Sequence, residues 1–153
     1  MKFHASEIIS AFEETRKTVG AKEGIVCIKE HYKGAIEAVT ALLPEYPSMK
    51  IKILPKVYPA GDEVVMIYDA TGRVVRPGGL PIEQGVAVFN VETMYNAYHA
   101  LEGENLTSKL VTVAGEVEKP CTVRVPLGAP LSEVVALAGK QTAENCVYWV
   151  GGP

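Results

Sequence analysis

The stretch GIVCIKEHYKGAIEAVTALLPEYPSMKIKIL, residues 24–54, decides the fold class of this protein. Residues 24–29 form a short apolar run bounded by polar residues, which is typical of a buried strand. Residues 32–43 place apolar side chains on one helical stripe, and a proline follows them as a stop signal. Residues 50–54 alternate between charged and apolar side chains and predict a second strand. A strand, a helix and a strand in this order predict parallel pairing through a crossover helix.

The segments around this unit continue the α/β pattern. Upstream, Ser6 is predicted to cap a helix that runs to about Thr18. Downstream, a short helix is predicted over 63–70, with Gly72 at its end. Residues 85–89 (GVAVF) predict a further buried strand. We therefore expect an α/β domain with a small parallel sheet.

Asn90 is predicted to cap a helix over 91–101, and the chain changes character beyond it. Residues 109–117 and 122–125 predict two strands, 130–138 a short helix and 147–150 a third strand, in which Trp149 would pack the small module. This order is typical of a ubiquitin-like (β-grasp) module. We therefore expect two domains, 1–103 and 104–153.

Composition excludes several function classes. The chain has 153 residues, 48% of them hydrophobic and 22% charged, which is ordinary for a globular protein. The net charge of −3 argues against a nucleic-acid partner, and the lack of an apolar run of about 18 residues argues against direct membrane insertion. Three scattered cysteines, Cys27, Cys121 and Cys146, match neither a disulfide framework nor a metal site. We expect the protein to be cytoplasmic.

Two segments carry candidate ligand contacts, and each also has an ordinary structural explanation. In 58–63 (YPAGDE), Gly61 can end a turn while Asp62 and Glu63 favour the first turn of a helix, or the glycine can admit a flat ligand and the carboxylates can bind ribityl or ribose hydroxyls. In 85–93 (GVAVFNVET), Asn90 can be only a cap, or it can mark a ligand site where a strand meets a helix. Spacing alone shows no catalytic constellation and no metal motif.

Taken together, three segments resemble the RnfC-like flavoproteins. They are 58–63, then 71–73 (TGR) with 77–81 (PGGLP), then 85–93, in this order and at close spacing. This group includes the RnfC subunit of ion-pumping electron transport complexes, the cobalamin reductases of the PduS type and the PrdC-type proteins, and it is similar to the NADH-binding flavin subunit of respiratory complex I. Segments 111–117, 125–128 and 150–153 likewise look like the family's SLBB domain.

The resemblance implies a function that composition and spacing do not reach. Residues 1–103 would be the C-terminal portion of a Rossmann-like domain that binds FMN and accepts hydride from NADH. By motif, Gly61, Asp62, Glu63, Asn90 and Val91 would line the flavin site. Asp62 and Phe89 stand where the complex I relative has a glutamate and an asparagine. Electrons would leave through 4Fe-4S clusters outside this chain, towards other electron-transfer subunits or a cobalamin-dependent system.

The resemblance also implies parts that this sequence does not contain. The family's glycine-rich loop for flavin phosphate and NADH and its cluster cysteines are absent from the 153 residues. We therefore expect a fragment of a longer protein that is inactive alone, cytoplasmic, and brought to a membrane through partners or enclosed in a bacterial microcompartment. The alternative is a non-catalytic SLBB module that serves as a docking surface.

Overall fold

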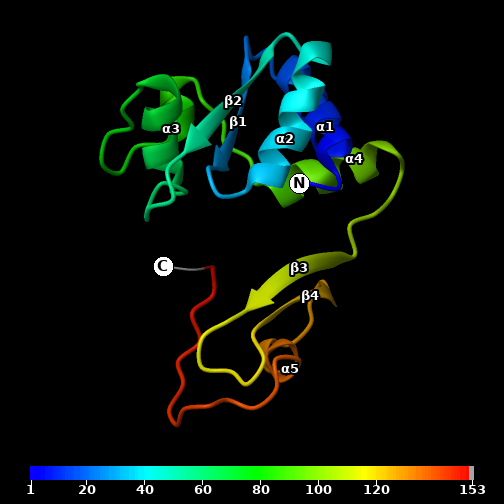
Figure 1. The fold of residues 1–153 in the computed structure, drawn as a ribbon, viewed down its shortest axis with the longest axis vertical. Coiled ribbons are helices and arrows are strands. Elements are labelled where there is room, and N and C mark those ends of the chain that lie inside the picture. Colours follow the sequence, from blue (N-terminus) through cyan, green and yellow to red (C-terminus); the bar gives the residue numbers. More distant parts are fainter. Residues whose placement is uncertain (152–153) are drawn as a thin grey trace. The chain divides into compact units, whose positions relative to one another are not determined.

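The computed structural model describes residues 1–151 as two compact units that divide after Glu104 (Figure 1). The last two residues of the SLBB-like segment 150–153 lie outside the described part. The first unit contains α1 (Ala5–Thr18), β1 (Gly24–Lys29), α2 (Lys33–Leu42), η1 (Leu43–Glu45), β2 (Met49–Leu54), α3 (Glu63–Thr71), η2 (Pro81–Gln84) and α4 (Val91–Leu101). The second contains β3 (Ser108–Val113), β4 (Cys121–Pro126) and α5 (Leu131–Ala136).

The sheet of the first unit consists of β1 and β2, which pair in parallel, with Val26 opposite Ile51 and Cys27 opposite Lys52. Helix α2 connects the two strands, and this confirms the crossover unit predicted from residues 24–54. Parallel strands need such a crossover because their chain directions agree. The α/β class predicted from sequence is therefore confirmed.

The core of this unit lies between β1 and the helices α1 and α2. Ile9 of α1 and Val39 of α2 are fully buried, and they pack with Val26 and Ile28 of β1. Alternation along the strand turns Cys27 away from this core. Burial raises the pKa of the Cys27 thiol; of the smaller effects, Lys52 lowers this pKa and Asp69 of α3 raises it. Cys27 thus faces α3, and the two sides of the sheet are covered by different helices.

The starts of α3 and α4 agree with the sequence predictions. The Asp62 carboxylate accepts hydrogen bonds from the backbone of Val64 and Val65, and α3 ends at Gly72 with φ of 72°. The Asn90 side chain accepts a hydrogen bond from the backbone of Glu92. Both caps satisfy N–H groups that have no partner inside their helix.

The predicted cap at Ser6 is wrong. Helix α1 begins at Ala5, and His4 takes the cap position, where its side chain makes no capping bond to the helix backbone and contacts the Glu7 carboxylate at 2.8 Å instead. Ala5 is buried in the core cluster with Ile9, so tertiary packing extends the helix past the residue that local preference favours.

Two predicted strands are also wrong. Residues 85–89 form no strand because no neighbouring strand pairs with them among the described residues; β1 and β2 pair only with each other. Residues 147–150 form no strand either, and the Trp149 side chain is 75% exposed rather than packed in the module. An apolar run forms a strand only where a second strand can pair with its backbone N–H and C=O groups.

The second unit is an antiparallel hairpin followed by a helix. Strands β3 and β4 pair with Val111 opposite Val123, and α5 adds the buried side chains of Val134 and Val135. The first strand ends at Val113, earlier than the sequence predicts, because Gly115 adopts φ of 99° and turns the chain. No helix within residues 1–151 has the length and hydropathy that crossing a bilayer requires.

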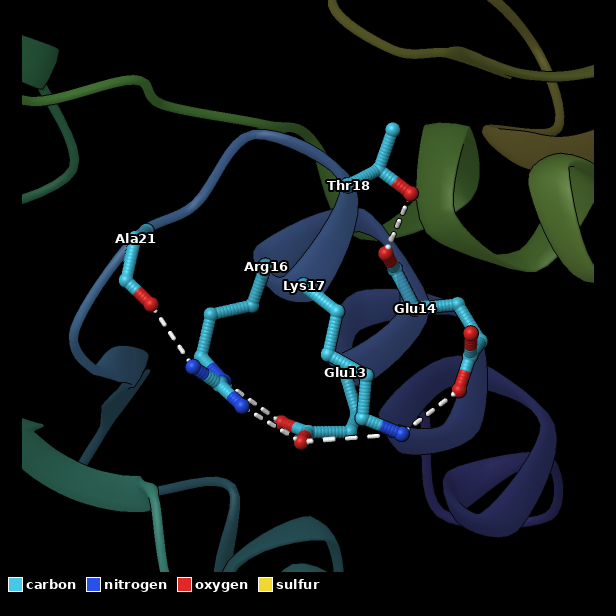
Figure 2. A network of polar contacts seen from close by, with 6 residues as sticks. All are labelled: Glu13, Glu14, Arg16, Lys17, Thr18 and Ala21. Atoms are coloured by element: carbon cyan, nitrogen blue, oxygen red, sulfur yellow. Dashed lines mark hydrogen bonds and ion pairs between the residues drawn. The ribbon is translucent and has the colours of Figure 1, made fainter.

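The end of α1 carries a network of polar contacts (Figure 2). The Arg16 guanidinium donates two hydrogen bonds of 2.7 Å to the Glu13 carboxylate and one of 2.6 Å to the Ala21 carbonyl. Lys17 pairs with Glu14 at 2.8 Å. The hydrogen bonds from Arg16 lower the pKa of the Glu13 carboxyl against the opposing effect of its burial.

This network predicts acid-sensitive stability. Because folding lowers the pKa of Glu13, its contribution to stability is present above the ordinary pKa of 4.5 and is lost as the pH falls through the folded value. We expect Glu13→Gln to flatten the fall of the unfolding free energy below pH 4.5, measured by urea titration. The matched control is Glu14→Gln, since the Glu14 side chain is 55% exposed. If the unfolding free energies of Glu13→Gln and of the unchanged protein fell equally steeply below pH 4.5, this prediction would be contradicted.

Candidate functional site

Gly61, Asp62 and Glu63 lie where the loop after β2 enters α3. The Asp62 amide donates to the Pro59 carbonyl at 2.6 Å, and Ala60 beside it is buried. One oxygen of Asp62 accepts from Val64 at 2.9 Å and from Val65 at 3.2 Å. Asp62 therefore performs the capping role, which leaves its second carboxylate oxygen free of these two bonds.

The fold does not require a glycine at position 61. The backbone of Gly61 lies outside the positive-φ region, in contrast to Gly72. A methyl group added there would meet only the flexible end of Lys29, at 3.6 Å from Cε and 3.7 Å from Nζ, which is ordinary contact. Because the backbone does not require glycine here, the lack of a side chain is consistent with the close approach of a ligand.

Two charged groups lie close to this junction. Glu63 is exposed at the first position of α3, and Lys29 ends β1 beside Gly61. Within the described residues neither side chain forms an ion pair. An ammonium next to a glycine can hold the negative or hydrogen-bond-accepting part of a ligand.

Asn90 and Val91 start α4. The Asn90 side-chain oxygen accepts from the Glu92 amide at 2.8 Å, so the amino group of the same side chain keeps its two donors. Val91 is 38% exposed, while Met94 one turn later is buried. The helix is therefore anchored by Met94 and offers its first turn to solvent.

The structure does not join these two groups directly. Helix α3 packs on β1 and β2, whereas α4 packs on α1 (Figure 1). Among residues 1–151, no hydrogen bond or ion pair connects 61–63 with Asn90 or Val91. The same part of the chain holds no cluster of His, Cys, Asp or Glu arranged to bind a metal.

Two further residues of the first unit, Lys29 and Arg73, received no role from the sequence prediction. Lys29 is a charged residue at the end of a buried strand, a position where ligand contacts are common in α/β sheets. Arg73 lies just past α3 and donates to the carbonyls of Gln84 and Gly85. The position of Lys29 was a usable signal, whereas no local pattern indicates the Arg73 contact.

The cap at Asp62 gives a testable prediction. We expect Asp62→Ala to destabilise the protein by about 1 kcal/mol, since two amides of α3 lose their acceptor. Asp62→Asn is the matched control, because asparagine caps as well as aspartate but carries no charge. Chemical unfolding followed by circular dichroism measures both. Equal stability of the alanine variant and the unchanged protein would exclude the capping role.

Comparison with known proteins places this geometry in context. Residues 1–99 match the family described as the Nuo51 FMN-binding domain, and residues 110–139 match the SLBB domain. The chain is 44% identical over 150 residues to the cobalamin reductase PduS of Salmonella typhimurium, covering 97% of this chain and 33% of that protein. It is 32% identical over 156 residues to a subunit of the ion-translocating oxidoreductase complex of Rhodobacter capsulatus, covering 100% of this chain and 30% of that protein.

A third relative is a subunit of the Na(+)-translocating ferredoxin:NAD(+) oxidoreductase complex of Acetobacterium woodii, which is 28% identical over 155 residues, covering 100% of this chain and 35% of that protein. The chain spans about a third of the length of these curated relatives. The resemblance inferred from the three sequence segments is confirmed. The chain belongs to the family of the Nuo51 FMN-binding domain and carries an SLBB domain after it.

Proposed function

We propose that this chain is part of an NADH-oxidising FMN flavoprotein that passes electrons through iron–sulfur clusters outside the chain to a downstream acceptor. The observation that carries the proposal is the match of residues 1–99 to an FMN-binding domain. The name of the Acetobacterium woodii relative includes NAD(+), which supports a nicotinamide as the electron donor or acceptor. The names of the Salmonella and Rhodobacter relatives also describe redox enzymes.

The residues of the candidate site fit parts of a flavin nucleotide. Gly61 carries no side chain although its backbone does not require a glycine, and only the end of the flexible Lys29 side chain lies beside it, which suits the approach of a flat ring. Glu63 and the free oxygen of Asp62 can accept hydrogen bonds from ribityl hydroxyls, while the Asn90 amino group can donate to a carbonyl of the ring. FMN would supply the chemistry, since a flavin accepts hydride and releases single electrons. Val91 would add apolar contact beside Asn90.

The proposed partners follow from the same relatives. We propose that the protein works with other electron-transfer subunits or with a cobalamin-dependent system. Its proposed location is the cytoplasm, where membrane partners or a bacterial microcompartment would hold it. We propose that the 153 residues by themselves are inactive.

The test is the flavin content of the full-length gene product. We expect absorbance near the bands of oxidised flavin, which NADH bleaches under anaerobic conditions. Extraction should release FMN rather than FAD. A well-folded full-length protein without flavin, and without flavin uptake on addition of FMN, would overturn the proposal.

A docking role for the second unit is the alternative, and exposed apolar side chains favour it. Leu127, Leu131 and Leu137 are 52%, 45% and 59% exposed. Exposed apolar side chains mark an interaction surface where they form a contiguous patch. A full-length protein that lacks flavin but binds a redox subunit through residues 105–153 would favour this alternative over the proposed flavoprotein.

A further inference from the structure

The segment between α3 and α4 has little regular structure, although Val75 within it is buried. Residues 72–90 contain only the four-residue η2 as regular structure. Backbone groups that lie outside helices and strands need other partners or solvent. The contacts that this segment makes, together with the packing of α4 on α1, therefore determine where Asn90 lies.

Among these contacts, those of the Arg73 side chain span many residues of the chain, eleven to Gln84. Its guanidinium Nη1 donates to the Gln84 carbonyl at 2.7 Å and lies 3.4 Å from the Gly85 carbonyl. Its backbone amide donates to the Thr71 hydroxyl at 3.2 Å, which holds Arg73 at the end of α3. Gly85 itself adopts φ of 65°, a conformation that glycine accepts without strain.

These bonds connect the two halves of the candidate site. Helix α3 begins directly after Gly61 and Asp62 and is nine residues long. Arg73 ties the end of that helix to Gly85, which lies five positions before Asn90. Arg73 is also close enough to Glu23 to lower the pKa of that carboxyl, after the larger effect of Lys50.

A second arginine in the same segment shows the contrast. Arg76 pairs with Glu83 at 3.3 Å across a turn, and its side chain is 76% exposed. The Arg76 pair closes only the turn around the glycines 78 and 79, whereas Arg73 spans eleven residues to Gln84. An exposed ion pair of this kind contributes little to stability.

We infer that Arg73 is a positioning residue of the flavin site: it sets the placement of Asn90 relative to Gly61 by holding the carbonyls of Gln84 and Gly85. The inference rests on the proposed function. Because the Arg73 side chain is exposed, its loss should affect the placement of the segment more than the global stability of the fold. Displacement of a binding group by about 1 Å can reduce a function on the order of 100-fold.

The experiment uses the full-length gene product with Arg73→Gln, Arg73→Lys and Arg76→Gln. Fluorescence titration measures the Kd for FMN, and amide exchange of residues 85–90 is measured without flavin. We expect Arg73→Gln to raise the Kd by about 10-fold or more, and to speed exchange in this segment. Arg73→Lys should recover part of the loss, since lysine provides the charge but not the planar fork. Arg76→Gln should stay within about twofold.

The outcomes separate this inference from the proposed function. If the unchanged protein binds FMN and Arg73→Gln binds it equally well, the positioning role is overturned while the proposed function stands. If Arg73→Gln lowers the melting temperature together with the affinity, with faster exchange throughout the first unit, Arg73 is only structural and the inference is overturned. If the unchanged protein binds no flavin, both are overturned. Weaker FMN binding with local loss of protection and an unchanged melting temperature supports the inference.

Discussion

Gly61→Ala should weaken FMN binding by the full-length gene product on the order of 100-fold and leave its stability nearly unchanged. The added methyl group would point from Gly61 towards the end of the Lys29 side chain, on the side where the flavin ring is proposed to approach. The fold accepts this methyl group, since its nearest neighbour is Lys29 Cε at 3.6 Å. Loss of glycine flexibility in the unfolded chain could even stabilise the protein by about 0.4–1 kcal/mol.

Two measurements make this prediction specific. Fluorescence titration gives the Kd for FMN, and urea unfolding of the protein without flavin gives the free energy of unfolding. The control is Gly72→Ala, which should show the opposite pattern. Gly72 adopts φ of 72°, so alanine there should cost about 1–2 kcal/mol of stability. Normal FMN affinity of Gly61→Ala would remove Gly61 from the flavin site.

Ile9→Ala should lower the free energy of unfolding by about 2–5 kcal/mol, the largest stability effect that we expect. Ile9 is fully buried between α1, α2 and β1, where it contacts the cluster of Val26 and Val39. Truncation removes buried methyl groups and leaves a cavity that the helices cannot fully close. Since the total free energy of unfolding of a single domain is about 5–15 kcal/mol, this variant should unfold at a markedly lower urea concentration.

Two controls accompany this prediction: a smaller truncation at the same buried position and a large truncation at an exposed position. Ile9→Val removes one methylene and should cost about 0.5–1.5 kcal/mol. Phe3→Ala removes a large side chain that is 86% exposed, and its effect should stay within about 0.5 kcal/mol. Equal stability of Ile9→Ala and Phe3→Ala would contradict the burial of Ile9 between α1, α2 and β1.

The part of the candidate site that could be predicted from sequence is the role of its residues at the two helix starts. The sequence predicts Asn90 as a helix cap and places Asp62 at the start of a helix, and both side chains accept backbone hydrogen bonds there. This works because a helix start depends only on the residue and on the next turn of the chain. Whether these residues and Gly61 contact a flavin stays a prediction, because ligand contact depends on groups that are distant in sequence.

The sequence by itself determined the elements that need only neighbouring residues. The crossover unit of residues 24–54 and the helices that follow Asp62 and Asn90 came from local periodicity and from the residues at the helix starts. Three motifs in order also determined the family. Only the tertiary structure decided that 85–89 and 147–150 form no strand, that α1 starts at Ala5, and that Arg73 holds Gly85. The reason is physical: strand pairing, burial of a helix end and a hydrogen bond across eleven residues each require a partner whose position the local sequence does not encode.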